Sequence, residues 1–179
     1  ANEVKTKCTV CGKSYPTTKE YFAKREAVSR GFKTQCKFCT VIKDSSYRNT
    51  ERGFLMQLIN SWYGRVFRKK KYIHSSLYHE IITKEMMFEH WEEHKEKYGY
   101  HCFYTKEIMT HLGSVLQDGR RKFTRTRTNI SIDRIDNEKG YTKENTVFCT
   151  WDFNDRKGSI TFDICKKVLR AGEKRGLHV

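Results

Sequence analysis

Apolar side chains recur every three or four positions in two stretches near the middle of the chain. Residues 46–72 carry Phe54, Leu55, Leu58, Ile59, Trp62, Val66 and Phe67. Residues 83–98 begin at Thr83, a residue type that often caps helices, and carry Met86, Met87, Trp91 and Tyr98. Because a 3.6-residue period places such positions on one face, the pattern predicts two amphipathic helices between residues 46 and 100.

A different pattern fills residues 130–157. Two short runs of β-branched and aromatic residues, at 130–135 and 147–148, flank the polar residues 137–144. Gly140 lies within this polar segment and permits a tight reversal of the chain. Helical spacing then returns up to residue 157, so the predicted order is strand, loop, strand and helix.

A last amphipathic run begins near Thr161. Its apolar positions are Phe162, Ile164, Cys165, Val168 and Leu169. We expect these side chains to pack against the hairpin that precedes them, because an isolated apolar helix face gains stability only by burial.

Polar side chains occupy three fixed places on the 130–157 frame. Asp133 ends the first predicted strand, Asn145 precedes the second, and Asn154 lies in the helix. Carboxylate and amide oxygens are hard ligands of the kind that Mg²⁺ prefers. The alternative is an ordinary hairpin, because Asp, Asn and Gly are also the common residues of turns.

Four of the seven cysteines form two matched pairs. Cys8 and Cys11 are spaced as CxxC, as are Cys36 and Cys39, and residues 12–35 separate the pairs. This pattern predicts tetrahedral, structural zinc bound by four thiolates, since four protein ligands leave no position for water. An odd cysteine total without a secretion signal argues against a disulfide framework.

The charge balance points to a polyanionic partner. Lys and Arg number 36 against 21 acidic residues, giving a net charge of +15. Neutralising phosphates releases counterions, so we expect a polyanionic partner, although charge alone also fits a ribosomal-type or merely soluble basic protein. With no long apolar helix, lipidation motif or signal peptide visible, an intracellular protein without a membrane partner or small-molecule cofactor is expected.

Two clusters of cations are predicted to contact DNA. One ends the first long helix and comprises Arg65, Arg68, Lys69 and Lys70. The other precedes the first predicted strand of the hairpin and comprises Arg120, Arg121, Lys122, Arg125 and Arg127. The alternatives are a solvated helix end for the first cluster and a mobile basic loop for the second. A further pattern, HxxEH from His90 to His94, matches a zinc-protease motif, but an ordinary amphipathic helix explains it better.

The order of these parts resembles the ββα-metal (HNH, or His-Me finger) nuclease motif of phage and intron-homing endonucleases. Residues 133–136, Asp-Arg-Ile-Asp, match the first segment of that motif, and Gly140-Tyr141 match its loop. Asn145 matches its middle Asn, and Asn154 with Lys157 match its last part. The sequence HisCysPheTyrThr at 101–105 is similar to the strand that precedes the motif in phage relatives. The N-terminal cysteines are similar to an accessory zinc module of phage HNH proteins.

The resemblance implies an α+β protein in three parts. These are a zinc-binding module with four cysteine ligands at 1–45, a helical connector at 46–100 and a ββα-metal nuclease domain at 101–179. The implied activity is divalent-metal-dependent DNA endonuclease, with Mg²⁺ (Mn²⁺ as a substitute) in the nuclease domain. The alternative is a catalytically inactive, zinc-containing DNA-binding protein that retains the ββα frame.

The resemblance also implies a role for each matched residue. Asp133 and Asn145 would hold Mg²⁺, Asn154 would orient the hairpin or complete the ligand shell, and Lys157 would contact phosphate. Arg134 stands where the family has its general-base histidine. An arginine cannot accept a proton at ordinary pH, so it would instead stabilise transition-state charge. Water activation is left to Asp136, His101, His111 or a metal-bound hydroxide.

Overall fold

The structure is a computed structural model, which describes residues 4–27, 29, 31–68, 81–113, 115–117, 120–122 and 126–176. For Arg68, 115–117 and 120–122 it describes the backbone alone. The described residues form five helices and four two-stranded antiparallel sheets, so the predicted α+β class is confirmed. Lys69, Lys70 and Arg125, which were predicted to contact DNA, lie outside the described residues.

The chain divides into two compact units. The first comprises Ala1–Gly53 and Gly113–Thr124, and the second comprises Phe54–Leu112 and Arg125–Val179. The predicted zinc module at 1–45 lies within the first unit, and the predicted hairpin and helix at 130–157 lie within the second. None of the described helices is long and apolar enough to cross a membrane.

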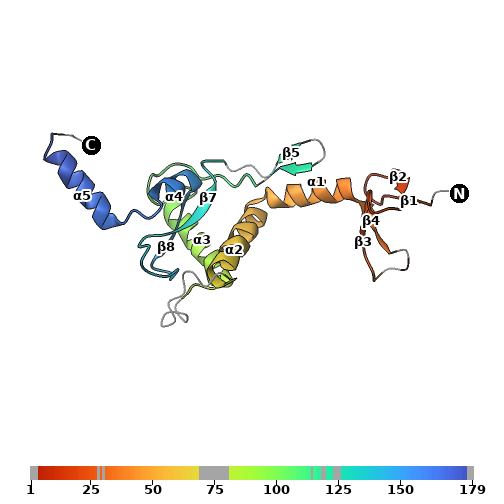
Figure 1. Ribbon diagram of the computed structural model, residues 1–179, viewed down its shortest axis with the longest axis horizontal. Coiled ribbons are helices and arrows are strands. Elements are labelled where there is room, and N and C mark those ends of the chain that lie inside the picture. Colours follow the sequence, from red (N-terminus) through yellow and green to blue (C-terminus); the bar gives the residue numbers. More distant parts are fainter. Residues whose placement is uncertain are drawn as a thin grey trace. The chain divides into compact units, whose positions relative to one another are not determined.

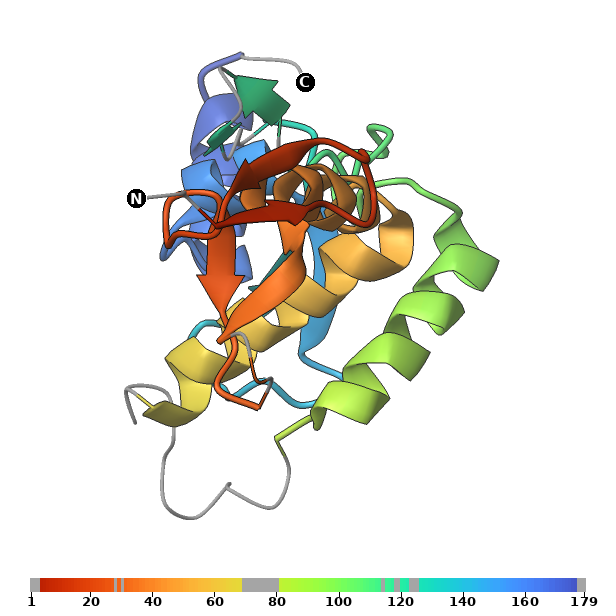
Figure 2. The same cartoon turned by 90° about the vertical axis from the view of Figure 1, so that its right-hand side faces the viewer.

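Short hairpins and one helix build the first unit, and its first two hairpins are visible in red and orange in Figure 2. Its elements in chain order are β1 (Lys5–Lys7), β2 (Ser14–Pro16), β3 (Phe22–Lys24), β4 (Phe32–Cys36), α1 (Lys37–Arg48), β5 (Val115–Gln117) and β6 (Arg120–Lys122). Strand pairs β1–β2, β3–β4 and β5–β6 are each antiparallel. The small core consists of Phe22 and three buried cysteines, packed against Tyr15, Tyr21 and Phe32. So small an apolar core makes cross-links through the cysteines important for stability.

Gly53 ends the first unit at a point of close backbone approach. A Cβ atom at this position would lie 1.9 Å from the carbonyl oxygen of Tyr47. The amide of Gly53 donates to Thr50 Oγ1 at 3.1 Å, as expected for a threonine that caps the start of a helix. Only glycine therefore fits at this position, in the first turn of the helix that follows α1.

The second unit surrounds one hairpin with helices (Figure 1). Its elements are α2 (Glu51–Arg68, from Phe54 onward), α3 (Lys84–Tyr98), β7 (Ile130–Arg134), β8 (Thr146–Thr150), α4 (Trp151–Lys157) and α5 (Phe162–Glu173). Trp62 from α2, Trp91 from α3 and Phe148 from β8 are almost fully buried in its core. The two predicted amphipathic helices and the predicted strand, loop, strand and helix are thus confirmed, and Thr83 caps α3 as predicted, accepting a hydrogen bond from the amide of Met86.

Helix α5 differs from its prediction, because its apolar face does not pack on the hairpin. No residue of α5 is buried, and Val168 is 65% exposed. The apolar side chains left at the surface are Phe162, Ile164, Val168 and Leu169. The physical reason is that α4 packs against both strands of the hairpin while Trp62 and Trp91 fill the core on which the strands lie. A hairpin of two strands leaves little further surface for another helix.

Candidate functional site

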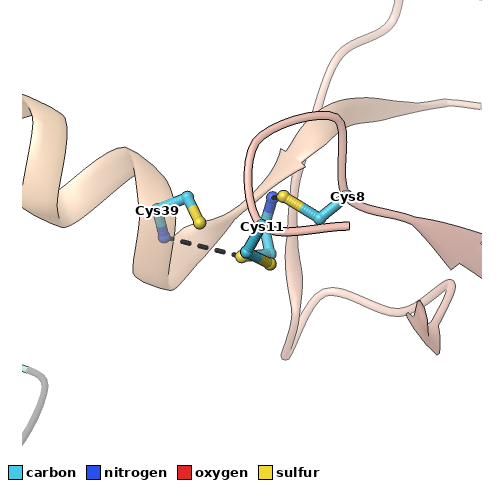
Figure 3. Close-up of side chains that lie close together, drawn as sticks. Cys8, Cys11 and Cys39 are labelled. Carbon is cyan, nitrogen blue, oxygen red and sulfur yellow. Dashed lines mark hydrogen bonds between the residues drawn. The ribbon is translucent and has the colours of Figure 1, made fainter. Parts of the chain in front are cut away.

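Four cysteine side chains of the first unit converge at one point. The sulfur atoms of Cys8, Cys11, Cys36 and Cys39 all lie within 4.8 Å of one another. Figure 3 shows Cys8 and Cys11 on the loop after β1, with Cys39 on the first turn of α1. Four thiolates around zinc at ~2.3 Å would place the sulfurs ~3.8 Å apart. The cluster could therefore bind a metal ion such as zinc with only a small contraction.

Backbone amides orient the sulfur atoms of this four-cysteine cluster. Cys8 Sγ accepts from the amides of Cys36 at 3.3 Å and Val10 at 3.4 Å. Cys36 caps α1, and its Sγ accepts from the amide of Cys39 at 3.5 Å. Gly12 follows the first pair with φ +70°, a conformation that side chains rarely adopt. Both CxxC pairs are thus held in turns that aim their thiols at a common centre.

Burial and these amides shift the cysteine pKa values in opposite directions. The amide of Cys36 and its neighbours lower the pKa of Cys8 to about 6. Burial, followed by the adjacent thiols, raises the pKa of Cys39 to about 12. Burial likewise raises the pKa of the Cys36 thiol. Four thiolates are therefore not stable together without a cation, which is the electrostatic condition that a bound dication satisfies.

The second polar centre lies where α4 covers β7. Strands β7 and β8 pair in register, with Asp133 opposite Val147 and Ile130 opposite Thr150. Thr150 ends β8 and caps α4, accepting from the amide of Phe153 at 3.4 Å, so the helix begins directly after the strand. Ser131 and Asp133 share one face of β7 because strand side chains alternate with period two.

Asp133 is buried and fully engaged at one of its oxygens. Lys157 Nζ lies 3.0 Å from Asp133 Oδ2, and the two side chains are 7% and 6% exposed. Tyr104 donates its hydroxyl to the same oxygen at 2.9 Å. Burial, with the neighbouring Asp133 charge, raises the pKa of Tyr104 well above its usual value, so the tyrosine remains a donor. We call these three residues the Asp133 centre.

The role of Lys157 differs from the predicted phosphate contact. Besides its ion pair with Asp133, its ammonium donates to the carbonyl oxygen of Arg134 at 2.6 Å. Both interactions point inward, toward the end of β7, and the side chain is buried. In this structure Lys157 is therefore a partner of the β7 terminus and not a surface cation.

Asn154 anchors α4 to β7. Its Nδ2 donates to Ser131 Oγ at 2.8 Å and to the carbonyl oxygen of Ile132 at 3.1 Å. Asn154 and Lys157 are three residues apart and so share one helix face. Within the described part of the chain, no hydrogen bond reaches Asn154 Oδ1 or Asp133 Oδ1. The predicted orienting role of Asn154 fits this geometry.

Asn145, which was expected to hold a metal ion, binds the backbone of the loop between β7 and β8. Its Oδ1 accepts from the amide of Asp136 at 2.8 Å. Its Nδ2 donates to the carbonyl oxygens of Asp136 at 2.9 Å and Gly140 at 2.8 Å. Because both ends of this buried amide are satisfied by backbone groups, Asn145 closes the loop between β7 and β8.

Arg134 closes the same loop from its other end. Its Nη1 donates to the carbonyl oxygens of Asn137 at 2.9 Å and Lys139 at 3.1 Å. Its guanidinium also lies 5.2 Å from the ring centre of Tyr141. Neighbouring strand residues point to opposite faces, so this side chain leaves β7 away from Asp133. The geometry favours a structural clamp over the predicted stabilisation of transition-state charge.

The three predicted proton acceptors contact groups other than Asp133. Asp136 Oδ1 accepts from the amide of Glu138 at 3.0 Å, and Oδ2 lies 3.7 Å from Lys139 Nζ. His101 Nδ1 is 2.9 Å from the carbonyl oxygen of Tyr98. His111 is half-buried in the segment after the third helix. Among the residues that the structure describes, no hydrogen bond or ion pair joins these three to Asp133.

The predicted DNA-binding cations are divided between the units. Arg120, Arg121 and Lys122 form β6 of the first unit, where the backbone alone is described. In the second unit, Arg65 donates to Ser61 Oγ at 2.9 Å, and the 74% exposed Arg127 lies 3.7 Å from Asp152. Both arginines are accessible to a polyanion. The side chain of Arg68 is not described.

The two histidines of the HxxEH pattern pack within the second unit, whereas Glu93 is exposed. His94 Nε2 is 2.9 Å from the carbonyl oxygen of His101, and its ring stacks on Trp91. His90 Nε2 is 2.7 Å from the carbonyl oxygen of Thr146. Both rings are used in packing α3 on its neighbours, as the ordinary-helix alternative predicted.

Sequence reasoning missed Tyr104 and Ser131 as members of the Asp133 centre and its surroundings. Tyr104 lies in the segment 101–105, which the resemblance singled out without giving its tyrosine a role. The signal for Ser131 was period-two alternation, which places it on the Asp133 face of the strand.

The chain was compared with known protein families, curated proteins and solved structures. No family model, curated protein or solved structure matches it.

Proposed function

We propose that this protein is a divalent-metal-dependent DNA endonuclease of the ββα-metal type, similar to phage and homing endonucleases, with structural zinc in its first unit. The single observation that carries the proposal is the ββα arrangement of the second unit. Asp133 of β7 pairs with Lys157 of α4, and Asn154 of the same helix bonds the carbonyl oxygen of Ile132, in the order that the motif resemblance requires.

We propose Asp133 and Asn154, in place of Asp133 and Asn145, as the ligands of a hard dication. Each keeps one oxygen to which no described residue donates a hydrogen bond, whereas Asn145 is occupied by the loop. When bound there, Mg²⁺ or Mn²⁺ would stabilise negative charge on a scissile phosphate and on the leaving oxygen. Tyr104 and Lys157 hold Asp133 in place, and Asn145 with Arg134 fixes the loop that follows it.

Zinc in the four-cysteine cluster would have a structural role. All four ligands come from the protein, so no coordination position remains for a reacting water. The cysteines join the loop after β1 to the start of α1, and the unit has few other buried residues. Zinc therefore supplies stability to the first unit.

Duplex DNA is the proposed partner because the net charge is +15 and cationic segments occur in both units. Neutralising Arg120, Arg121, Lys122, Arg125 and Arg127 together should weaken binding to all sequences and reduce the salt dependence by ~0.9 per lost phosphate contact. A matched control removes the same charge from exposed residues of the C-terminal segment: Lys166, Lys167, Arg170, Lys174 and Arg175. Fluorescence anisotropy across a salt series measures both. Equal losses in the two variants would contradict a specific role for the first cluster.

A second candidate function is DNA binding without catalysis. Two observations favour it: Arg134 stands at the family's base position and is tied to the loop, and the charge of Asp133 is already balanced by Lys157. In this case the ββα frame would serve as a binding scaffold.

Plasmid cleavage distinguishes the two functions. Supercoiled plasmid is incubated with zinc-loaded protein in separate reactions. One has no addition, one contains chelator, one contains Zn²⁺ alone, and the last contains Zn²⁺ plus Mg²⁺ or Mn²⁺. An endonuclease should cleave only in the last condition. Asp133→Asn should lower the rate on the order of a hundredfold to a thousandfold, as for other preorganised charged groups. Asp155→Asn is the control, because Asp155 is an exposed carboxylate on α4. DNA binding without cleavage under every condition would replace the endonuclease with the binding protein.

A further inference from the structure

The carboxylate of the Asp133 centre has a cation built into the chain. Lys157 Nζ is 3.0 Å from Asp133 Oδ2, and both side chains are shielded from solvent. A buried carboxylate requires a partner of opposite charge, and the ammonium meets this requirement without any bound ion.

Three features hold Lys157 in this position. It is the last residue of α4, and the helix ends at Gly158, whose amide donates to the carbonyl oxygen of Asn154 at 3.1 Å. Asn154, three residues earlier, ties the same helix face to β7. The ammonium itself bonds the carbonyl oxygen of Arg134 at 2.6 Å. The ion pair is therefore a fixed part of the packing between α4 and β7.

A dication at Asp133 would share the carboxylate with this ammonium. Two positive charges within a few ångströms repel strongly where water is excluded, and the repulsion acts directly against metal binding. Free metal would thus encounter a carboxylate whose charge is already balanced, while Asn154 offers only a neutral oxygen.

We propose that Lys157 is an internal competitor of the divalent cation, which lowers the affinity of Asp133 and Asn154 for Mg²⁺ or Mn²⁺. The inference rests on the proposed function, because that function assigns Asp133 to the metal ion. A competitor role for Lys157 differs from a role in holding α4 against β7. A merely structural Lys157 would change stability when replaced, whereas a competitor also changes the affinity for the metal.

The test is Mn²⁺ binding to full-length, zinc-loaded protein, measured by the electron paramagnetic resonance signal of free Mn²⁺. In Lys157→Gln the charge is lost, but an amide that can donate to the carbonyl oxygen of Arg134 is kept. We expect Mn²⁺ to bind at least about tenfold more tightly to this variant than to wild type. Lys166→Gln removes the same charge from an exposed position on α5 and should leave the affinity unchanged.

Two further variants make the result decisive. The double variant Asp133→Asn with Lys157→Gln should lose the gain, because no anionic ligand remains. If Lys157→Gln is unfolded without metal, folding that returns with Mn²⁺ supports the proposal, and folding that does not return contradicts it. Equal affinities in wild type, Lys157→Gln and Lys166→Gln would overturn the competitor role. Mg²⁺-dependent cleavage by wild type would still support the endonuclease, so the two proposals fail separately.

Discussion

The four-cysteine cluster and the Asp133 centre differ in what balances their charge. The cluster brings four thiols within 4.8 Å and contains no cationic side chain among its members. The Asp133 centre brings one carboxylate against an ammonium and a phenol. A site of the first kind depends on an ion from solution, and a site of the second kind is complete without one. We therefore expect tight metal binding at the cluster and weak metal binding at Asp133.

Cys36→Ser should disrupt zinc binding by the four-cysteine cluster, and we expect this change to have the largest effect. Binding of structural zinc is worth about 10–16 kcal/mol in small zinc modules, and that free energy is largely folding free energy. Cys36 is buried and caps α1, and serine can still cap the helix, so the loss of zinc from this variant reports the missing ligand. Elemental analysis should show one zinc per wild-type chain and a loss of zinc from the variant.

Cys165→Ser is the matched control, because Cys165 is an exposed cysteine on α5. It should keep its zinc and its resistance to limited proteolysis within residues 4–48. A wild-type protein that is folded in this region without zinc would contradict the structural role of the metal.

Asn145→Ala tests whether Asn145 closes the loop between β7 and β8 or binds a metal ion together with Asp133. The variant leaves the amide of Asp136 and two carbonyl oxygens without their partner. We expect a loss of about 2–4 kcal/mol in the free energy of unfolding, from unsatisfied buried polar groups. Chemical denaturation measures this loss. Asn137→Ala, which removes one exposed hydrogen bond to Gly158, should cost far less.

The Mn²⁺ affinity of Asn145→Ala distinguishes a loop-closing role of Asn145 from a metal-ligand role. If Asn145 only closes the loop, folded Asn145→Ala should bind Mn²⁺ like wild type. A selective loss of Mn²⁺ affinity would return Asn145 to the ligand position that the motif resemblance first gave it.

The sequence predicted the cluster more completely than the Asp133 centre, for a physical reason. Zinc ligands come in local pairs, because two cysteines of a CxxC turn must grip one ion, and this spacing is visible in the sequence. The partners of Asp133 are distant: Tyr104 lies 29 positions away, and α4 returns to β7 only after the hairpin has formed. Such contacts depend on packing, which spacing does not encode.

The roles of matched residues were less predictable than their positions. The pattern at 130–157 placed Asp133, Asn145 and Asn154 on the correct strand, loop and helix. It did not show that the amide of Asn145 and the guanidinium of Arg134 both bind loop carbonyls. Helix α5 shows the same limit, because its periodicity correctly predicted a helix but not whether any surface remained to cover its apolar face.

Arg134→Lys should have a smaller effect, confined to the loop. Lysine keeps the positive charge but has a shorter side chain and lacks the planar guanidinium, which here donates to two carbonyl oxygens and lies 5.2 Å from the ring centre of Tyr141. We expect a loss of about 1–2 kcal/mol in the free energy of unfolding. Amide hydrogen exchange should rise in residues 135–145 and remain unchanged in α2 and α3. A rise in hydrogen exchange of equal size throughout the second unit would contradict a local clamp.

The pH dependence of stability that His94 contributes should be the smallest effect. Burial, and to a lesser degree the nearby His90 and Lys106 charges, lowers the pKa of His94 below its ordinary value of 6.5, against the opposing effect of the His101 carbonyl. The unfolded chain therefore binds the proton more readily than the folded chain. This contribution to stability is present above pH 6.5 and is lost as the pH falls below it. Replacing His94 with Gln removes the titration while keeping a donor for the carbonyl oxygen of His101. The stability difference between wild type and His94→Gln, measured by thermal denaturation, should shrink from pH 7.5 to pH 5.5. His111→Gln serves as the control, and a difference that grows on acidification would contradict the lowered pKa.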